Sequence, residues 1–188
     1  MAEYNFERSS FRIRLWIDEQ PDFPAVPREK LRNLSSLSCG TATPRHSSTA
    51  IEYFRPRGGM YHYGLLAAHL GAESSDGLLQ GRVPVSSRNS SLAWSGSLNR
   101  CEGDTLFGFA QEYTPAIVEG VHQCSIGLPR SGQLTFTAMA HSKVGSAPLV
   151  FHSLTKAVVR SLSHSHPYRS VEDVLALMDE CASDPHDE

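Results

Sequence analysis

The segment from Arg55 to Tyr63 combines the residue types with the clearest capacity to bind a ligand. It reads Arg-Pro-Arg-Gly-Gly-Met-Tyr-His-Tyr, so two positive charges stand beside a glycine pair and three ring side chains. Arginine pairs with phosphate groups, and Tyr or His rings stack on unpaired bases. Glycine also lets a backbone approach a ligand closely. The pattern indicates an RNA-binding loop, and the alternative is an ordinary hairpin whose rings pack on the core.

The histidines raise the question of a metal site. The chain has nine, including the pair His164 and His166 with His152 upstream. On a strand, side chains two residues apart point to the same side and could share a metal ion, whereas at a helix end they diverge. No cysteine or carboxylate stands at a familiar zinc spacing from them. We therefore interpret the pair as a His-rich surface turn and expect neither a metal nor a cofactor.

The familiar catalytic motifs are missing from the sequence. It has no Gly-x-x-x-x-Gly-Lys-Ser/Thr loop for a triphosphate and no His-Glu-x-x-His pair. Serine, histidine and aspartate are all present, but no Gly-x-Ser-x-Gly elbow positions a nucleophile. These observations point away from an enzyme and toward a binding protein without a GTPase.

The composition is that of an ordinary globular chain. Hydrophobic residues make up 40% and charged residues 20% of the 188, and the formal net charge is −3. No apolar run reaches the roughly 20 residues that a membrane span needs, and the N-terminus lacks a signal peptide, so we expect a cytoplasmic protein. The four cysteines are widely spaced, as in reduced chains. RNA binding would need a local basic patch, because the whole chain is mildly acidic.

Apolar periodicity indicates the elements that would position these residues. Alternation predicts a strand at 11–17, and β-prone residues indicate further strands at 51–54 and 61–70. We expect a short helix around 28–37, and a Ser- and Gly-rich insertion with a hairpin at 71–105.

In the second half, Thr114 and Pro115 predict a helix start, with Thr114 as the capping residue. A strand is expected at 134–138. A second helix should open at Pro148, and Ser170 should cap a third.

Three segments, in order, resemble domain IV of translation elongation factor G and its ribosomal-protection relatives. Residues 58–64 read Gly-Gly-Met-Tyr-His-Tyr-Gly, where the family has Gly-Gly-x-Gly-Gln-Tyr-Gly. Residues 112–121 read Glu-Tyr-Thr-Pro-Ala-Ile-Val-Glu-Gly-Val, close to the family's Glu-Tyr-x-Pro-Ala-Val-x-x-Gly-Ile. Residues 144–151 match the third family segment at Val144, Ser146 and Phe151, with Gly145 in place of its aspartate.

The resemblance implies an α+β fold, and its architecture would be a four-stranded, mostly antiparallel sheet. Two helices would cover one face of that sheet, joined by a left-handed βαβ crossover. We expect this domain at residues 51–165. Residues 1–50 would be an N-terminal extension with a strand at 11–17, and residues 166–188 a C-terminal helix with an acidic tail.

In the family, two tip loops of this domain enter the ribosomal decoding site. The resemblance therefore implies a non-catalytic domain that binds the ribosome or ribosomal RNA. The residues implied to make contact lie in two loops: Arg57, Gly58, Gly59, Met60, Tyr61, His62, His141, Ser142 and Lys143.

Two other functions stay open. One is a small enzyme or small-molecule binder with a pocket lined by His62, His141 or Tyr61. The other is an interaction module or homo-oligomer that associates through sheet edges or the apolar stripe of residues 171–178.

Overall fold

A computed structural model gives the arrangement of most of the chain. It describes residues 2–8, 11–18, 20–24, 30–34, 37, 40, 45–57, 59–71, 78–86, 92–99, 104–163, 168 and 170–179.

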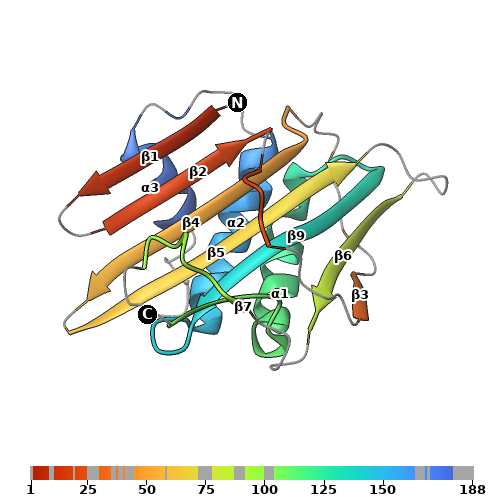
Figure 1. Ribbon diagram of the computed structural model, residues 1–188. Helices are drawn as coiled ribbons and strands as arrows, with labels where there is room; N and C mark the ends of the chain where they lie inside the picture. The colour runs from red at the N-terminus through yellow and green to blue at the C-terminus, as the bar shows by residue number, and fades with distance from the viewer. Residues whose placement is uncertain are drawn as a thin grey trace, which may run out of the picture.

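One nine-stranded sheet, backed by three α-helices, dominates the described part of the chain (Figure 1). The strands are β1 (Ala2–Arg8), β2 (Phe11–Ile17), β3 (Lys30–Leu34), β4 (Ser48–Arg57), β5 (Met60–Gly71), β6 (Leu79–Val85), β7 (Leu92–Ala93), β8 (Thr105–Phe107) and β9 (Gly132–Ser142). The helices are α1 (Thr114–Cys124), α2 (Pro148–Ser163) and α3 (Val171–Asp179), with 3-10 turns η2 (Gln111–Tyr113) and η3 (Ser125–Gly127).

The main strand order is β1-β2-β4-β5-β9-β6-β3, and the short pair β7–β8 attaches to the end of β9. Neighbours are antiparallel except β6 and β9, which run parallel with α1 between them in the chain. The hairpin of β4 and β5 pairs Arg57 with Met60 at its tip, and β5 also pairs with β9 along its other side. The longest strands therefore lie at the middle of the sheet.

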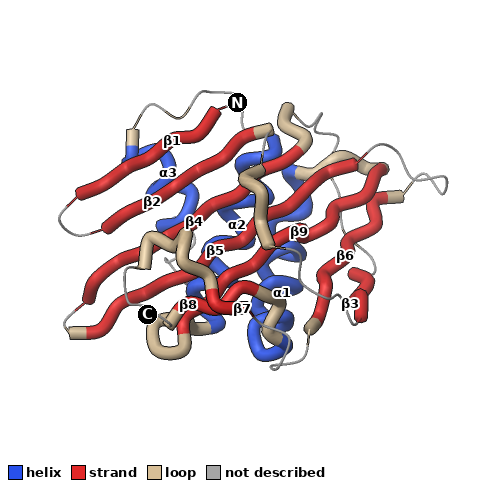
Figure 2. The backbone as a smooth tube through the Cα atoms, viewed as in Figure 1, coloured by secondary structure: helices blue, strands red, loops and turns tan. Residues whose placement is uncertain are grey.

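The helices lie together on one face of the sheet (Figure 2). Alternation in β2 turns Phe11, Ile13, Leu15 and Ile17 to this side, where they join the main apolar core. Helix α2 contributes Phe151, Leu154 and Val158, all without exposed surface. Ser170 caps α3 as predicted, because its hydroxyl accepts the Asp173 N–H at 3.2 Å.

Two irregular segments cross the opposite face, which is the one that Figure 1 presents to the viewer. Phe23, from residues 20–24, stacks on Phe107 with ring centroids 5.4 Å apart. Trp94, from residues 92–99, packs edge-on against the same ring at 5.7 Å. They cover a second, smaller cluster that includes Trp16 and Tyr63.

The predicted four-stranded sheet with two helices is wrong, because the observed sheet has nine strands and three helices pack on it. The helix expected around 28–37 is also wrong where the structure describes it, since residues 30–34 form edge strand β3. The hairpin expected within residues 71–105 is not formed by β6 and β7, which pair with different neighbours. The helix at Thr114 begins without a side-chain cap.

The sheet has more than the expected four strands because segments on both sides of the central hairpin add strands to it. Strands β1 and β2 add to the free side of β4, and β6 and β3 add to the free side of β9. Each addition pairs backbone groups that would otherwise stay open at a sheet edge. The strand expected at 11–17 is β2, so the first fifty residues contribute to the same sheet as the rest.

Candidate functional site

The two loops that the sequence singled out meet at one end of the molecule. The Tyr63 N–H, in β5, donates to the Gly145 carbonyl at 2.9 Å. The hydroxyl oxygens of Tyr61 and Ser142, 81 residues apart in the chain, lie in contact at 2.8 Å. We call this end, made of residues 55–62 on the β4–β5 hairpin and residues 141–145 before α2, the apical end.

A carboxylate ties the two loops together. Asp104, just before β8, accepts hydrogen bonds from the Tyr61 hydroxyl and, at 2.7 Å, from the Ser142 hydroxyl. The Asn99 amide donates to the same oxygen at 3.1 Å. A single carboxylate oxygen with three donors is a strong anchor, because a hydrogen bond to a charged acceptor is stronger than one between neutral groups.

The turn after β9 is fixed by its own serine and by a close approach. The Ser142 hydroxyl accepts the N–H groups of Val144 and Gly145 at 3.1 and 2.8 Å. A Cβ atom on Gly145 would collide with the ring of Tyr61, so only glycine fits this position. The apical end is thus a packed structure in which each loop sets the shape of the other.

The predicted contact residues differ in their access to solvent. Gly59 and Lys143 are exposed and Met60 keeps 66% of its surface, while Tyr61 and His62 are half-buried. Gly58 and the side chain of Arg57 lie outside the described residues.

Two predicted contact residues lie below the surface. Ser142 and His141 are buried, and the His141 ring tilts against Tyr113 at 5.5 Å. Burial lowers the pKa of His141 and so disfavours its charged form. Both residues therefore support the apical end from inside.

Sequence reasoning left three exposed apical residues out of the contact set, Arg55, Pro56 and Val144. Arg55 is exposed near the tip of β4, and Val144 keeps 69% of its surface in the turn before α2. Arg55 was visible in the sequence as part of the basic segment. The exposure of Val144 has no sequence signal, because an isolated valine in a turn reads equally well as buried.

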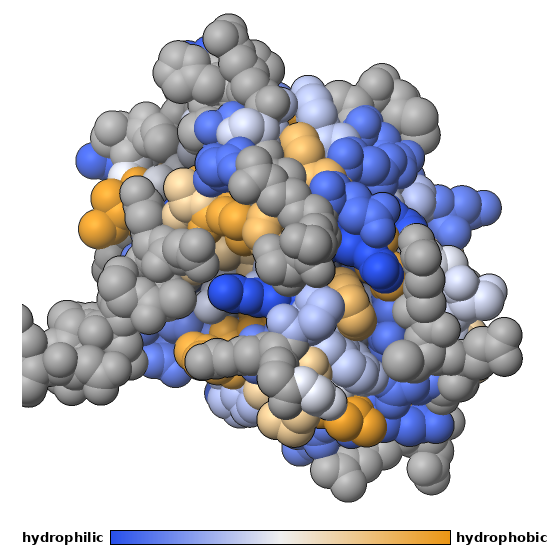
Figure 3. All heavy atoms as spheres, turned by 90° about the vertical axis from the view of Figure 1, so that its left-hand side faces the viewer, coloured by the Kyte–Doolittle hydropathy of each residue, from blue (hydrophilic) through white to orange (hydrophobic). Residues whose placement is uncertain are grey.

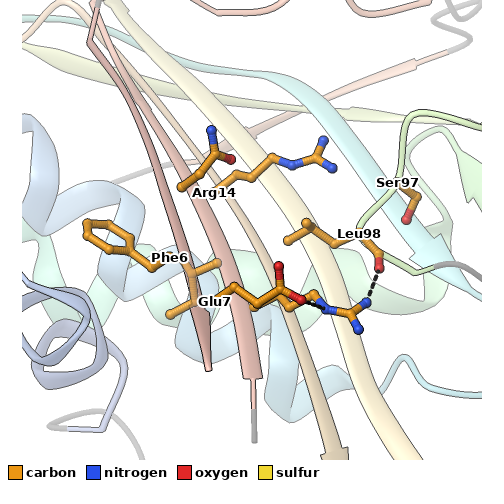
Figure 4. A pocket seen from close by; sticks show the side chains of 8 residues that line it. Phe6, Glu7, Arg14, Ser97 and Leu98 are labelled. Atoms are coloured by element: carbon orange, nitrogen blue, oxygen red, sulfur yellow. Dashed lines mark hydrogen bonds and ion pairs between the residues drawn. The ribbon is translucent and has the colours of Figure 1, made fainter. Parts of the chain in front are cut away.

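A groove of about 360 Å³ opens on the sheet face opposite the helices (Figure 4). Its lining residues come from β1, β2 and the crossing segment of residues 92–99: Asn5, Phe6, Glu7, Arg12, Ile13, Arg14, Ser97 and Leu98. Tyr61, His62 and His141 are not among them. The His- and Tyr-lined pocket expected for a small-molecule binder is therefore not this groove.

A buried carboxylate lies beside the groove. Glu52, in β4, has no exposed surface and accepts hydrogen bonds from the Leu98 N–H at 2.7 Å and the Tyr63 hydroxyl at 3.1 Å. Its second oxygen lies 3.5 Å from the Arg14 guanidinium. Burial raises the pKa of the Glu52 carboxyl, and burial also raises the pKa of Tyr63. Glu52 therefore anchors the crossing segment to the sheet.

Comparisons of the chain with protein-family models, curated proteins and solved structures find no match. None of the helices in the described part of the chain has the length and apolar character needed to cross a bilayer. Within the same residues, no three His, Cys, Asp or Glu side chains are grouped so that they could hold a metal ion.

Proposed function

We propose that this chain is a non-catalytic RNA-binding protein whose apical end contacts the RNA. The observation that carries the proposal is the junction of two loops from distant parts of the sequence, each of which exposes a basic side chain, Arg55 or Lys143. The ribosome or ribosomal RNA is the expected partner, because the resemblance to the elongation factor domain suggests it.

The charge at the apical end suits a phosphate backbone. Arg55 and Lys143 are exposed, and the neighbouring carboxylate of Asp104 is half-buried and occupied by three donors. Two basic side chains can neutralise about two phosphates. For a single strand, the logarithm of the binding constant then falls with the logarithm of the salt concentration, with a slope of about −0.7 for each phosphate. Binding should therefore be modest and should weaken with salt.

The apolar residues of the same end could contact bases. Met60 and Val144 are the large apolar side chains exposed on the two loops. The ring of Tyr61 stacks on Phe54 with centroids 5.4 Å apart, so one of its faces is already covered. Figure 3 shows the side of the molecule at which the tip of the β4–β5 hairpin lies, and the coloured apolar residues there form small separate groups among polar ones.

Cosedimentation with ribosomes at low and moderate salt tests the proposal. We expect saturable binding of the wild-type protein that weakens with salt, and a loss of roughly tenfold in affinity for the double variant Arg55→Ala/Lys143→Ala. Lys30→Ala/Arg32→Ala is the matched control, because it removes the same charge from exposed positions of edge strand β3. Absence of binding at low salt, or equal loss in both double variants, would overturn the proposal.

The interaction-module alternative receives less support from the third helix. Val174 and Met178, on its apolar stripe, are buried in the protein's own core, and Leu175 and Leu177 pack against that core. The helix is thus already covered by its own chain. Of the surfaces named for self-association, the sheet edges at β1, β3 and β7 remain in the described part of the chain.

A further inference from the structure

The groove of Figure 4 has a peptide floor and polar walls. The register of β1 and β2 places Asn5 opposite Arg14 and Glu7 opposite Arg12, with the pair Phe6 and Ile13 between them. Phe6 and Ile13 direct their side chains to the helix side, where both join the main core. Because strand side chains alternate, the four polar residues project from the other side and enclose the floor.

The crossing segment closes the groove and is held there by both arginines. Arg14 donates to the Gly96 carbonyl at 2.8 Å, and Arg12 donates to the Leu98 carbonyl at 3.3 Å. Leu98 also donates its N–H to the buried Glu52. These contacts preorganise the site, since the segment and both guanidinium groups have fixed positions before a ligand arrives.

The two arginines differ in how far they are already neutralised. Arg12 pairs with Glu7 at 2.9 Å and lies over the Phe54 ring. Arg14 is 27% exposed, and its nearest carboxylate, that of Glu52, is 3.5 Å away. Among the described residues, the Nε and Nη2 atoms of Arg14 form no hydrogen bond. Arg14 is therefore the guanidinium with donors to offer a ligand.

We propose that this groove binds a small monocarboxylate, with its carboxylate on Arg14 and an adjacent hydrogen-bond donor on the Asn5 side-chain oxygen. A guanidinium fork matches a carboxylate in a bidentate pair. The Asn5 nitrogen already donates to Glu3 at 2.9 Å, which leaves its oxygen to accept. A volume of about 360 Å³ is within the range of small-molecule sites.

A single negative charge fits the groove better than two. Glu7 cancels Arg12, and Glu52 balances Arg14 whenever its buried carboxyl is ionised, so the walls offer one net positive charge when Glu52 is neutral and none when it is ionised. A phosphate dianion would need a second available cation. This site does not depend on the RNA-binding proposal, because Arg14 and Asn5 lie outside the apical end.

The test is a titration of the ¹⁵N-labelled protein followed by two-dimensional NMR, with N-acetylglycine as the probe. N-acetylglycinamide is the matched neutral compound and inorganic phosphate the competing anion. We expect saturable shifts at millimolar N-acetylglycine, confined to the amides of residues 5–7, 12–14 and 96–98. The affinity for the amide compound and for phosphate, taken from the same titration, should be at least about tenfold lower, because a charged hydrogen-bonded pair contributes about that factor to binding.

Two variants test the assignment of residues. Arg14→Gln should weaken N-acetylglycine binding at least about tenfold, while Arg82→Gln, which removes the same charge from β6 far from the groove, should leave it unchanged. Asn5→Phe, at an exposed position, should fill the groove and abolish binding even if Arg14→Gln fails to fold. Equal shifts with the neutral amide, shifts spread over other basic residues, or unchanged binding to Asn5→Phe would each overturn the proposal.

Discussion

Helices cover one face of the sheet, whereas irregular segments cover the other. On the helix face, apolar side chains such as Phe136 and Phe151 interlock without exposed surface. On the opposite face, the cover consists of residues 20–24 and 92–99, and a carboxylate, Glu52, lies beneath it. Apolar packing is non-directional, so the helix face is held together without specific polar contacts. Its close packing also leaves no space for a ligand.

The second face depends on a few directed hydrogen bonds. The crossing segment is held by hydrogen bonds to Glu52, Arg12 and Arg14 in addition to the packing of Trp94 on Phe107. The arginines that hold this segment also keep hydrogen-bond donors near the surface, and they line the groove. The comparison teaches that the tightest apolar packing lies on the helix face, whereas the two sites that we propose for ligands lie on the other face and at the apical end.

The largest expected effect is on the helix face. Phe151→Ala should cost about 5 kcal/mol in the free energy of unfolding, because the ring is fully buried and packs on Tyr113 with centroids 4.4 Å apart. Phe107→Ala, on the other face, should cost about 3 kcal/mol, since the irregular cover can collapse into the space. Denaturant unfolding measures both. A larger loss for Phe107→Ala would reverse the comparison.

Removing the buried carboxylate should have the next largest effect. Glu52→Ala leaves the Leu98 N–H, the Tyr63 hydroxyl and the Arg14 guanidinium without their shared partner, at a cost of about 3 kcal/mol. The control is Glu119→Ala on the exposed side of α1, expected within about 0.5 kcal/mol of wild type. Unfolding of the two variants in denaturant compares them, and equal losses would show that the segment is held by other contacts.

The charge of Glu52 should appear as a pH dependence of smaller size. Burial raises its pKa in the folded protein, so the folded state binds the proton more tightly than the unfolded chain does. Stability from this group is therefore present at low pH and lost as pH rises from the unfolded value through the folded pKa.

Glu52→Gln removes that loss while keeping an oxygen acceptor for Leu98. The variant should gain stability relative to wild type as pH rises from 5 to 8, by about 1.4 kcal/mol for each unit by which the two pKa values differ. Denaturant unfolding at several pH values measures the difference. A constant difference across that range would mean that Glu52 does not titrate differently on folding.

The parts of the fold that sequence could predict are those with strong local signals. Alternation located β2, and the serine before Val171 located the start of α3 with its cap. Edge strand β3 gave no such signal, because of its five residues only Leu34 is buried and the rest are exposed. The size of the sheet was missed for the same reason, since pairing between distant strands leaves little trace in local composition.

In the candidate site, too, sequence could predict the residues with a local signal but not those whose role depends on contacts between distant segments. Sequence types predicted that Lys143 and Met60 contact a ligand, and both are exposed at the apical end, while the contact itself stays a prediction. The supporting roles of Asp104 and His141 arise only when distant segments meet, as they do at Tyr61 and Ser142. The groove escaped detection because Arg12 and Arg14 look like the solvent-facing half of an ordinary amphipathic strand.

The strand order also has a consequence for synthesis. Strand β5 lies between β4, its immediate predecessor in the chain, and β9, which follows only at residues 132–142. The β4–β5 hairpin can form as soon as residue 71 has been made, but the apolar middle of the sheet stays open on one side until β9 emerges. A chain whose central strands pair with a segment that is synthesised late folds slowly, and its unpaired apolar strands are exposed to aggregation until then. A nascent chain stalled before residue 132 should therefore bind chaperones strongly, and the full-length chain, in which α3 also covers its part of the core, should not.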